Sequence, residues 1–136
     1  MKIYSIGYSN RNIEEFIGLL KEFGIEIVVD VRRFPVSKFL CYKKDILKEI
    51  LEKNGIKYVH FENLGGYRGG YKEWMLTGEW KNAYNDLKKI ALNKKVVIMC
   101  VEKYPFKCHR RYITRQLIKE KWEVIHIING KVWKEK

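Results

Sequence analysis

Apolar residues follow two alternating patterns along this chain: short continuous runs, and stretches with the spacing of a helix. Continuous apolar runs bounded by glycine or polar residues are typical of buried strands, and they predict strands over residues 2–7, 25–31, 56–60, 95–101 and 123–128. Between these runs, apolar residues recur every three or four positions, which predicts helices with one apolar face. The predicted helices lie between Asn12 and Gly24, from Ile46 to Gly55, from Trp80 to Ala91, and over residues 108–121.

The order of these elements indicates the fold class. Strands that alternate with helices form a parallel sheet that is covered by helices. We therefore expect one α/β domain over residues 1–136, of the three-layer Rossmann-like or flavodoxin-like kind, with a mainly parallel sheet of about five strands. The chain is long enough for one such core, and no linker or low-complexity tract divides it.

Polar residues gather in the loops that follow the predicted strands, whereas the opposite loops are short and plain. In open parallel sheets, ligands bind outside the carboxyl ends of the strands. Among the residues that this rule places at one edge are Ser9, Arg11, Asp30, Arg32, Arg33, Gly65, Gly66, Cys100, Glu102, Cys108, His109 and Arg110. We expect them to form a functional site.

The segment 100–111 carries the most reactive side chains, because it brings two thiols, an acid, an imidazole and two guanidinium groups to one strand-to-helix turn. Free N–H groups and cations at a helix start lower the pKa of a thiol. We expect Cys108 to be the nucleophile or redox thiol, with Asp30 or Glu102 handling protons. His109 is a further catalytic candidate, but neighbouring residues in a helix do not face each other, so it need not be the base for Cys108.

Positive charge exceeds negative charge, with a formal net charge of +12 and a pI of about 9.6. Such a chain attracts polyanions, although abundant Lys and Glu also fit a thermophile-like surface. The arginines, unlike the lysines, lie mainly in or beside predicted turns, and arginine can hold a phosphate or carboxylate through two parallel hydrogen bonds. The candidate anion-binding residues are Arg11, Arg32, Arg110, Gly65, Gly66 and Ser9.

A glycine-rich loop over residues 65–70 encloses Tyr67 and Arg68. Glycine lets backbone N–H groups approach an anion closely, and it also permits a sharp turn. Aromatic residues in or near this loop, which could stack on bases, are Tyr67, Tyr71, Trp74 and Trp80. Packing of an amphipathic helix explains Trp80 equally well.

The three cysteines show no C-x-x-C spacing, so neither a thioredoxin motif nor a zinc finger is indicated. The C-x5-R spacing of phosphatases is absent as well, because Phe106 stands six residues after Cys100. We expect reduced thiols and no cofactor. Zinc held by Cys100, Cys108 and His109 is a weaker alternative, because their spacing matches no standard metal motif. The sequence leaves open whether Cys100 and Cys108 form a disulfide.

The first residues resemble a strand rather than a signal peptide, and no apolar run is long enough for a membrane helix. We therefore expect a cytoplasmic protein without a membrane partner. The oligomeric state stays open.

Several short motifs together resemble one known family. They are Ser5-Ile6-Gly7-Tyr8-Ser9, Val29-Asp30-Val31-Arg32, Pro35-Val36-Ser37, Leu64-Gly65-Gly66, Cys100-Val101-Glu102, Cys108-His109-Arg110 and Val124-Ile125-His126-Ile127. In this order they resemble domain-of-unknown-function family 488 (DUF488). The resemblance implies a small Rossmann-like α/β domain and no established reaction. It also implies a shared site at Asp30, Arg32, Cys100, Glu102, Cys108, His109 and Arg110. At Tyr8 the family frequently has histidine, so no role of that histidine carries over.

Three hypotheses for the function follow. The first is an enzyme that acts on a phosphate-bearing or nucleic-acid-related substrate through the thiol and the anion-binding residues. The alternative is a non-catalytic module that binds nucleic acid or nucleotide, with an affinity that falls steeply as salt rises. The third is an interaction module with a polar but inert cleft. We rank the enzyme first and the binding module second.

Overall fold

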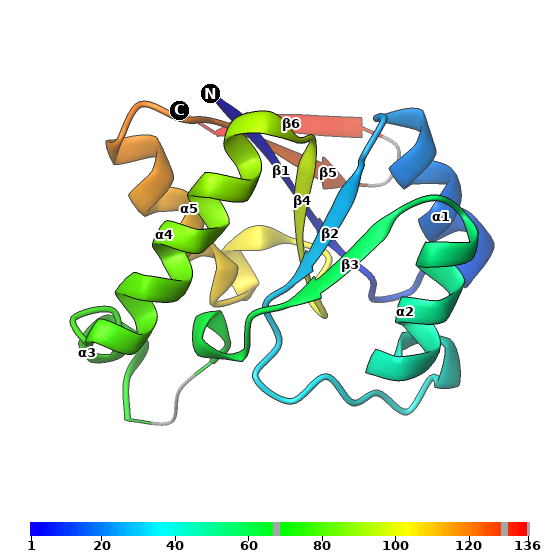
Figure 1. Ribbon diagram of the computed structural model, residues 1–136, viewed down its shortest axis with the longest axis horizontal. Coiled ribbons are helices and arrows are strands. Elements are labelled where there is room, and N and C mark those ends of the chain that lie inside the picture. The colour runs from blue at the N-terminus through cyan, green and yellow to red at the C-terminus, as the bar shows by residue number, and fades with distance from the viewer. Residues whose placement is uncertain (67–68, 129–130, 136) are drawn as a thin grey trace.

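A six-stranded sheet forms the centre of the protein, in the order β3-β2-β4-β1-β5-β6 (Figure 1). The structure is a computed structural model that describes residues 1–66, 69–128 and 131–135. The strands are β1 (Lys2–Gly7), β2 (Ile27–Asp30), β3 (Lys57–His60), β4 (Val96–Cys100), β5 (Glu123–Ile128) and β6 (Lys131–Glu135). The first five pair in parallel, and β6 pairs antiparallel with β5.

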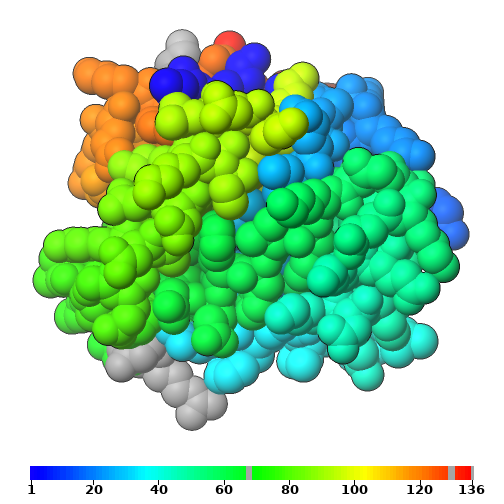
Figure 2. All heavy atoms as spheres, viewed as in Figure 1, coloured from blue at the N-terminus to red at the C-terminus, as the bar shows by residue number. Residues whose placement is uncertain are grey.

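Helices cover both faces of this sheet. They are α1 (Ile13–Glu22), α2 (Lys44–Lys53), α3 (Tyr71–Trp74), α4 (Gly78–Asn93) and α5 (Arg110–Lys119), with short 3-10 turns η1 (Leu40–Tyr42), η2 (Glu62–Leu64) and η3 (Pro105–Lys107). The apolar sides of α1 and α2 pack on one face of the sheet, and those of α4 and α5 pack on the other. With all atoms drawn, the segments from α2 to α4 form most of the surface in this view (Figure 2).

Local sequence signals account for where the helices begin and end. The side chain of Asn12 accepts a hydrogen bond of 2.8 Å from the backbone N–H of Glu15, which satisfies a free donor at the start of α1. Thr77 caps α4 in the same way. Gly24 and Gly55 follow α1 and α2 with positive φ angles of 67° and 75°, a conformation that glycine adopts at low cost.

The structure confirms the predicted fold class, a three-layer α/β domain with a mainly parallel sheet. It adds β6, which the sequence pattern missed because this edge strand is charged and exposed rather than apolar. It also starts α5 at Arg110 instead of residue 108, so Cys108 has an extended backbone. The predictions on Tyr67 and Arg68 lie outside the described residues. In the described parts of the chain, no helix is long and apolar enough to cross a membrane.

A crevice is expected where neighbouring strands send their connections to opposite faces of the sheet. The strands β2 and β4 are such neighbours, because α2 follows β2 on one face and α5 follows β4 on the other. In Figure 1 the segment after β2, drawn in light blue, runs along the lower edge of the molecule, below the carboxyl ends of the strands. This topology brings the loops after β2 and β4 together.

Gly7, the last residue of β1, lets the backbone after β4 pack directly against it. A Cβ atom at Gly7 would overlap the carbonyl oxygen of Glu102 and lie 2.7 Å from the backbone nitrogen of Lys103. We expect Gly7→Ala to lower the free energy of unfolding by about 2–4 kcal/mol, because backbone cannot move aside as a flexible side chain can.

Urea unfolding of Gly7→Ala and Gly18→Ala would check this prediction. Gly18 lies in α1, and a Cβ atom there meets nothing within 4 Å. The control should therefore gain up to about 1 kcal/mol from helix propensity. A Gly7→Ala protein as stable as the wild type would show that the end of β1 and the backbone after β4 are not tightly packed.

Candidate functional site

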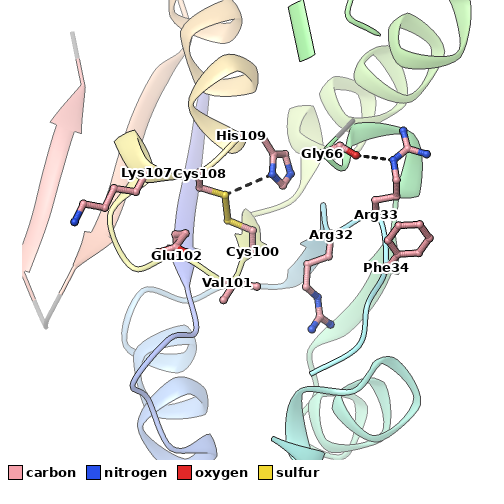
Figure 3. A pocket seen from close by; sticks show the side chains of 10 residues that line it. All are labelled: Arg32, Arg33, Phe34, Gly66, Cys100, Val101, Glu102, Lys107, Cys108 and His109. Atoms are coloured by element: carbon pink, nitrogen blue, oxygen red, sulfur yellow. Dashed lines mark hydrogen bonds between the residues drawn. A yellow bond between two sulfur atoms is a disulfide. The ribbon is translucent and has the colours of Figure 1, made fainter. Parts of the chain in front are cut away.

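A pocket opens at the carboxyl edge, between the segments that follow β2 and β4 (Figure 3). Its volume is about 910 Å³. The residues that line it are Arg32, Arg33, Phe34, Gly66, Cys100, Val101, Glu102, Lys107, Cys108 and His109. The pocket therefore contains seven of the residues that the sequence placed at this edge.

A disulfide between Cys100 and Cys108 lies in the middle of the pocket (Figure 3). Cys100 is the last residue of β4, and Cys108 follows η3; both side chains are buried, and their Cα atoms are 7.5 Å apart. The loop between them folds back through η3, which returns the chain to the end of β4. The expectation of reduced thiols is therefore wrong for this pair, whereas Cys41 is a free cysteine.

Arg110 holds the sulfur of Cys100. Its guanidinium is completely buried, and Nη1 donates to the Sγ atom of Cys100 at 2.8 Å and to the carbonyl oxygen of Glu102 at 2.5 Å. Nη2 donates to the carbonyl oxygen of Lys103 at 3.1 Å. Burial lowers the pKa of Arg110 to about 10, which still leaves the group charged at neutral pH. A cation at this distance would stabilise a Cys100 thiolate after reduction of the disulfide.

His109 is the group beside the other sulfur. Its Nδ1 atom lies 3.7 Å from the Sγ atom of Cys108, and its Nε2 atom lies 2.8 Å from the carbonyl oxygen of Val31. A carbonyl can only accept, so Nε2 carries a proton and Nδ1 of the neutral ring is an acceptor. Burial lowers the pKa of His109, which favours this neutral form.

The sequence argument that His109 and Cys108 do not face each other was therefore wrong. It assumed that both residues lie in one helix. Cys108 instead precedes α5 with φ −130° and ψ 151°, and this extended backbone turns its side chain toward the ring of the next residue. The structure thus brings three predicted catalytic residues to the pocket, namely Cys108, His109 and Glu102, and adds Cys100.

Asp30 is placed differently from the prediction. Its carboxylate is fully buried and accepts hydrogen bonds from Arg32 Nε at 2.9 Å and Arg32 Nη2 at 2.7 Å, and also from the hydroxyl of Tyr58. Arg32 also donates from Nη1 to the carbonyl oxygen of Tyr42 at 2.7 Å. Arg32 contributes to the wall of the pocket, but its guanidinium points away from the disulfide (Figure 3). The carboxylate of Asp30 is therefore engaged by Arg32 and Tyr58, outside the lining of the pocket.

Ser9 and Arg11 lie beside the pocket rather than in its lining. The backbone N–H of Ser9 donates to the carbonyl oxygen of Val101 at 2.9 Å. Arg11 is buried, and its Nε atom donates to the carbonyl oxygen of Gly7 at 2.9 Å. Burial lowers the pKa of Arg11.

The two glycines of the predicted anion loop have separate roles. A Cβ atom at Gly65 would overlap the backbone of Arg33, so this glycine permits two chain segments to touch. Gly66 lines the pocket, and its carbonyl oxygen accepts a hydrogen bond of 2.6 Å from Nε of Arg33. The guanidinium of Arg33 also lies 5.1 Å from the ring centre of Trp74.

Sequence reasoning missed Phe34 and Lys107 as lining residues. It placed Arg33 at this edge but did not name it as an anion-binding residue, because beyond the end of a strand the alternation of side chains no longer tells which residue faces the pocket. Phe34 is 73% exposed, a position for an aromatic ring that an apolar pattern does not reveal. Lys107 is exposed and lines the pocket, with its ammonium group pointing away from the disulfide (Figure 3).

Zinc binding by Cys100, Cys108 and His109 does not fit this arrangement. Zinc is held by thiolates, and the two sulfur atoms are joined to each other. In residues 1–66, 69–128 and 131–135, no group of three or more His, Cys, Asp or Glu side chains is arranged to hold a metal ion.

Comparison with known families identifies the chain. The family model described as "Domain of unknown function DUF488" matches residues 12–117, which is most of the 136 residues. The chain belongs to the DUF488 family. The match includes both cysteines of the disulfide, His109 and Arg110, and it confirms the family resemblance seen in the motifs. No curated protein and no solved structure matches the chain. For this DUF488 protein, the residues of the pocket are therefore what indicates its chemistry.

The neutral His109 predicts a pH dependence of stability. Because burial holds the pKa of His109 below the value of about 6.5 in the unfolded chain, the unfolded state takes up this proton first as pH falls. The stability contributed by the neutral ring is therefore complete above about pH 6.5 and is lost below it. We expect the free energy of unfolding to fall less between about pH 7.5 and about pH 5.5 in His109→Gln than in the wild type, by urea titration at each pH. Equal losses of unfolding free energy in His109→Gln and the wild type would contradict the assignment of a neutral His109.

Proposed function

We propose that this DUF488 protein is a thiol-dependent enzyme that acts on an anionic substrate, and that Cys100 and Cys108 alternate between dithiol and disulfide. One observation carries the proposal: the two sulfur atoms meet in the pocket, and each has its own activating group. Arg110 lies against Cys100, and the acceptor nitrogen of His109 faces Cys108.

The reduced pair can carry out a balanced two-electron reaction. The Cys108 thiol passes its proton to Nδ1 of His109, and the thiolate attacks one sulfur atom of a substrate disulfide. A Cys108–substrate disulfide forms, and the other half of the substrate leaves with the bonding electron pair. The Cys100 thiolate, stabilised by Arg110, then attacks the Sγ atom of Cys108 and expels the second half of the substrate. The substrate gains two electrons, the protein pair loses two, and an external dithiol restores the protein.

The division of roles follows from the positions of the sulfur atoms. Both cysteines are buried, and Cys108, at 7% exposed, is less buried than Cys100, at 1%, so we assign the contact with the substrate to Cys108. In the reverse direction, a reductant attacks Cys108, and Cys100 departs as the thiolate that Arg110 stabilises. Lys107 and Arg33 border the same pocket and favour a substrate that carries phosphate or carboxylate groups.

The test is the oxidation of the reduced protein by small disulfides. We expect oxidised glutathione, which is anionic, to oxidise the pair faster than the neutral disulfide of 2-mercaptoethanol. Lys107→Ala should reduce that preference. Cys108→Ser should abolish formation of the internal disulfide, whereas Cys41→Ser should leave it unchanged. Thiols that stay reduced with either reagent, or an undiminished reaction of Cys108→Ser, would refute the proposal.

Nucleic-acid or nucleotide binding is the second candidate function, and the exposed residues of the loops after β2 and β4 support it. The exposed aromatic residues on the loops after β2 and β4 are Phe34, Phe39, Tyr104 and Phe106, with Lys38, Lys43, Lys103 and Lys107 among them. Exposed rings that alternate with cations can stack on bases and contact phosphates. With the formal charge of +12, this arrangement favours single strands.

Fluorescence anisotropy with a short single-stranded oligonucleotide separates the two candidates. Binding should weaken steeply with salt and weaken further in Phe34→Ala and Lys107→Ala, but it should survive Cys108→Ser. Arg32→Ala is a poor probe, because its guanidinium is occupied by Asp30 and Tyr42. Absence of binding at low salt would remove this candidate.

A further inference from the structure

A line of buried hydrogen bonds leads from Cys100, through Arg110, to the edge strand β6. Nε of Arg110 donates to the hydroxyl of Ser5 at 3.3 Å, and that hydroxyl is in turn hydrogen-bonded to Nδ1 of His126. Nε2 of His126 lies 2.7 Å from the carboxylate of Glu135. The line therefore connects the guanidinium that holds Cys100 to a carboxylate on the last strand of the sheet.

The donors and acceptors along this line fit a neutral His126. A guanidinium can only donate, so the Ser5 oxygen accepts from Arg110. With a neutral ring, the Ser5 hydroxyl donates to Nδ1 of His126, and Nε2–H donates to Glu135. Burial lowers the pKa of His126, which favours this neutral form. In this arrangement each of the four groups has a partner.

Burying the polar groups of this line costs free energy unless each of them is hydrogen-bonded. Ser5 and His126 face each other in register on the neighbouring strands β1 and β5, and both are completely buried. A buried polar group without a partner costs about 1–3 kcal/mol, so each member depends on the next. The ring of His126 is stacked on Trp133 at 5.1 Å, and the side chain of Glu135 is 17% exposed. The stacked ring of His126 and the carboxylate of Glu135 therefore fix the end of this line of hydrogen bonds that is far from Cys100.

We propose that Ser5, His126 and Glu135 are positioning residues for Cys100: they hold Arg110 so that its Nη1 atom stays on the sulfur and sets the acidity and redox equilibrium of the thiol pair. This inference rests on the proposed function, because it takes Cys100 as a reactive thiol. It assigns a role to three residues that do not line the pocket, all of which lie outside the matched family range.

Two conservative variants test the line. Ser5→Ala removes the hydroxyl that accepts from Arg110, and Glu135→Gln removes the charge at the outer end while keeping its shape. Glu123→Gln is the matched control, because Glu123 is a carboxylate on the adjacent strand that pairs with Lys134 and not with His126. In each background, Cys41→Ser and Cys108→Ser leave Cys100 as the one thiol to titrate by its thiolate absorbance. The intact pair is equilibrated separately with glutathione.

We expect Ser5→Ala to raise the midpoint of Cys100 ionisation by about one pH unit and to shift the glutathione equilibrium toward the disulfide by about tenfold. Glu135→Gln should move both in the same direction by a smaller amount, and Glu123→Gln should move neither. A merely structural role would lower the melting temperature of the variants and leave both thiol measurements unchanged. That result would overturn the inference while the proposed function stands. An ordinary ionisation of Cys100 in the wild type would instead count against the proposed function itself.

Discussion

Asp30→Asn is expected to lower the free energy of unfolding by about 3–5 kcal/mol, because it leaves the charge of Arg32 buried without its partner. Arg32 is 4% exposed and gives two side-chain hydrogen bonds to the carboxylate of Asp30, which is completely buried. The amide of asparagine can accept only one of these two hydrogen bonds, through its oxygen, and its NH2 group would face the other donor of Arg32. The hydroxyl of Tyr58 donates to the same carboxylate and would lose strength as well.

Urea unfolding of Asp30→Asn beside Glu49→Gln would check this expectation. Glu49 also forms an ion pair, with Lys53 at 3.1 Å, but its side chain is 66% exposed. Loss of that pair should cost less than about 0.5 kcal/mol, since water screens it. The double variant Asp30→Leu with Arg32→Met should recover much of the loss, because it leaves no buried charge. Equal, small losses in Asp30→Asn and Glu49→Gln would show that the buried pair does not hold the strand end.

The fold could be predicted from the sequence because its signals are local. Buried parallel strands appear as continuous apolar runs, and amphipathic helices between them have clear starts and stops. The strand β6 escaped this reasoning because its residues are exposed and charged, and only its pairing with β5 makes it a strand. The apolar pattern of one segment cannot reveal a strand that forms only by pairing with another segment.

The candidate site could be predicted only as a location. The rule for parallel sheets brought the residues after β2 and β4 to one edge, and the structure joins them in a pocket. Which side chains face each other depends on the exact path of the loops. The sequence could not reveal that Arg110 contacts Cys100 rather than Cys108, or that Asp30 is enclosed by Arg32 and Tyr58.

Charge at this edge is not balanced inside the protein. The buried arginines are Arg11, Arg32 and Arg110, whereas Asp30 is the buried carboxylate among the described residues. Arg32 is neutralised by Asp30, and the carboxylate of Glu135 reaches Arg110 only through two intervening side chains. A thiolate or a bound anion would meet an electropositive setting here, which connects the acidity of Cys100 with the affinity of the pocket.

Arg110→Met should have the largest effect on the thiol chemistry. It removes the cation that contacts the sulfur of Cys100 and keeps most of the buried volume. We expect the midpoint of Cys100 ionisation to rise by about two pH units, because a neighbouring opposite charge shifts an ionisation by one to three. The dithiol form loses this stabilisation, so the glutathione equilibrium should move about a hundredfold toward the disulfide.

Arg111→Met is the matched control for this experiment. Arg111 is the next residue of α5, and its Nη1 atom donates to the carbonyl oxygen of Phe106 rather than to a sulfur. It should leave both thiol measurements unchanged. Arg110→Lys should restore part of the effect, since it keeps the charge but not the planar set of donors that spans Cys100, Glu102 and Lys103. If Arg110→Met and Arg111→Met behaved alike, the contact between Arg110 and Cys100 would be a packing contact, and the reactivity of the pair would have to arise from His109 and Cys108 alone.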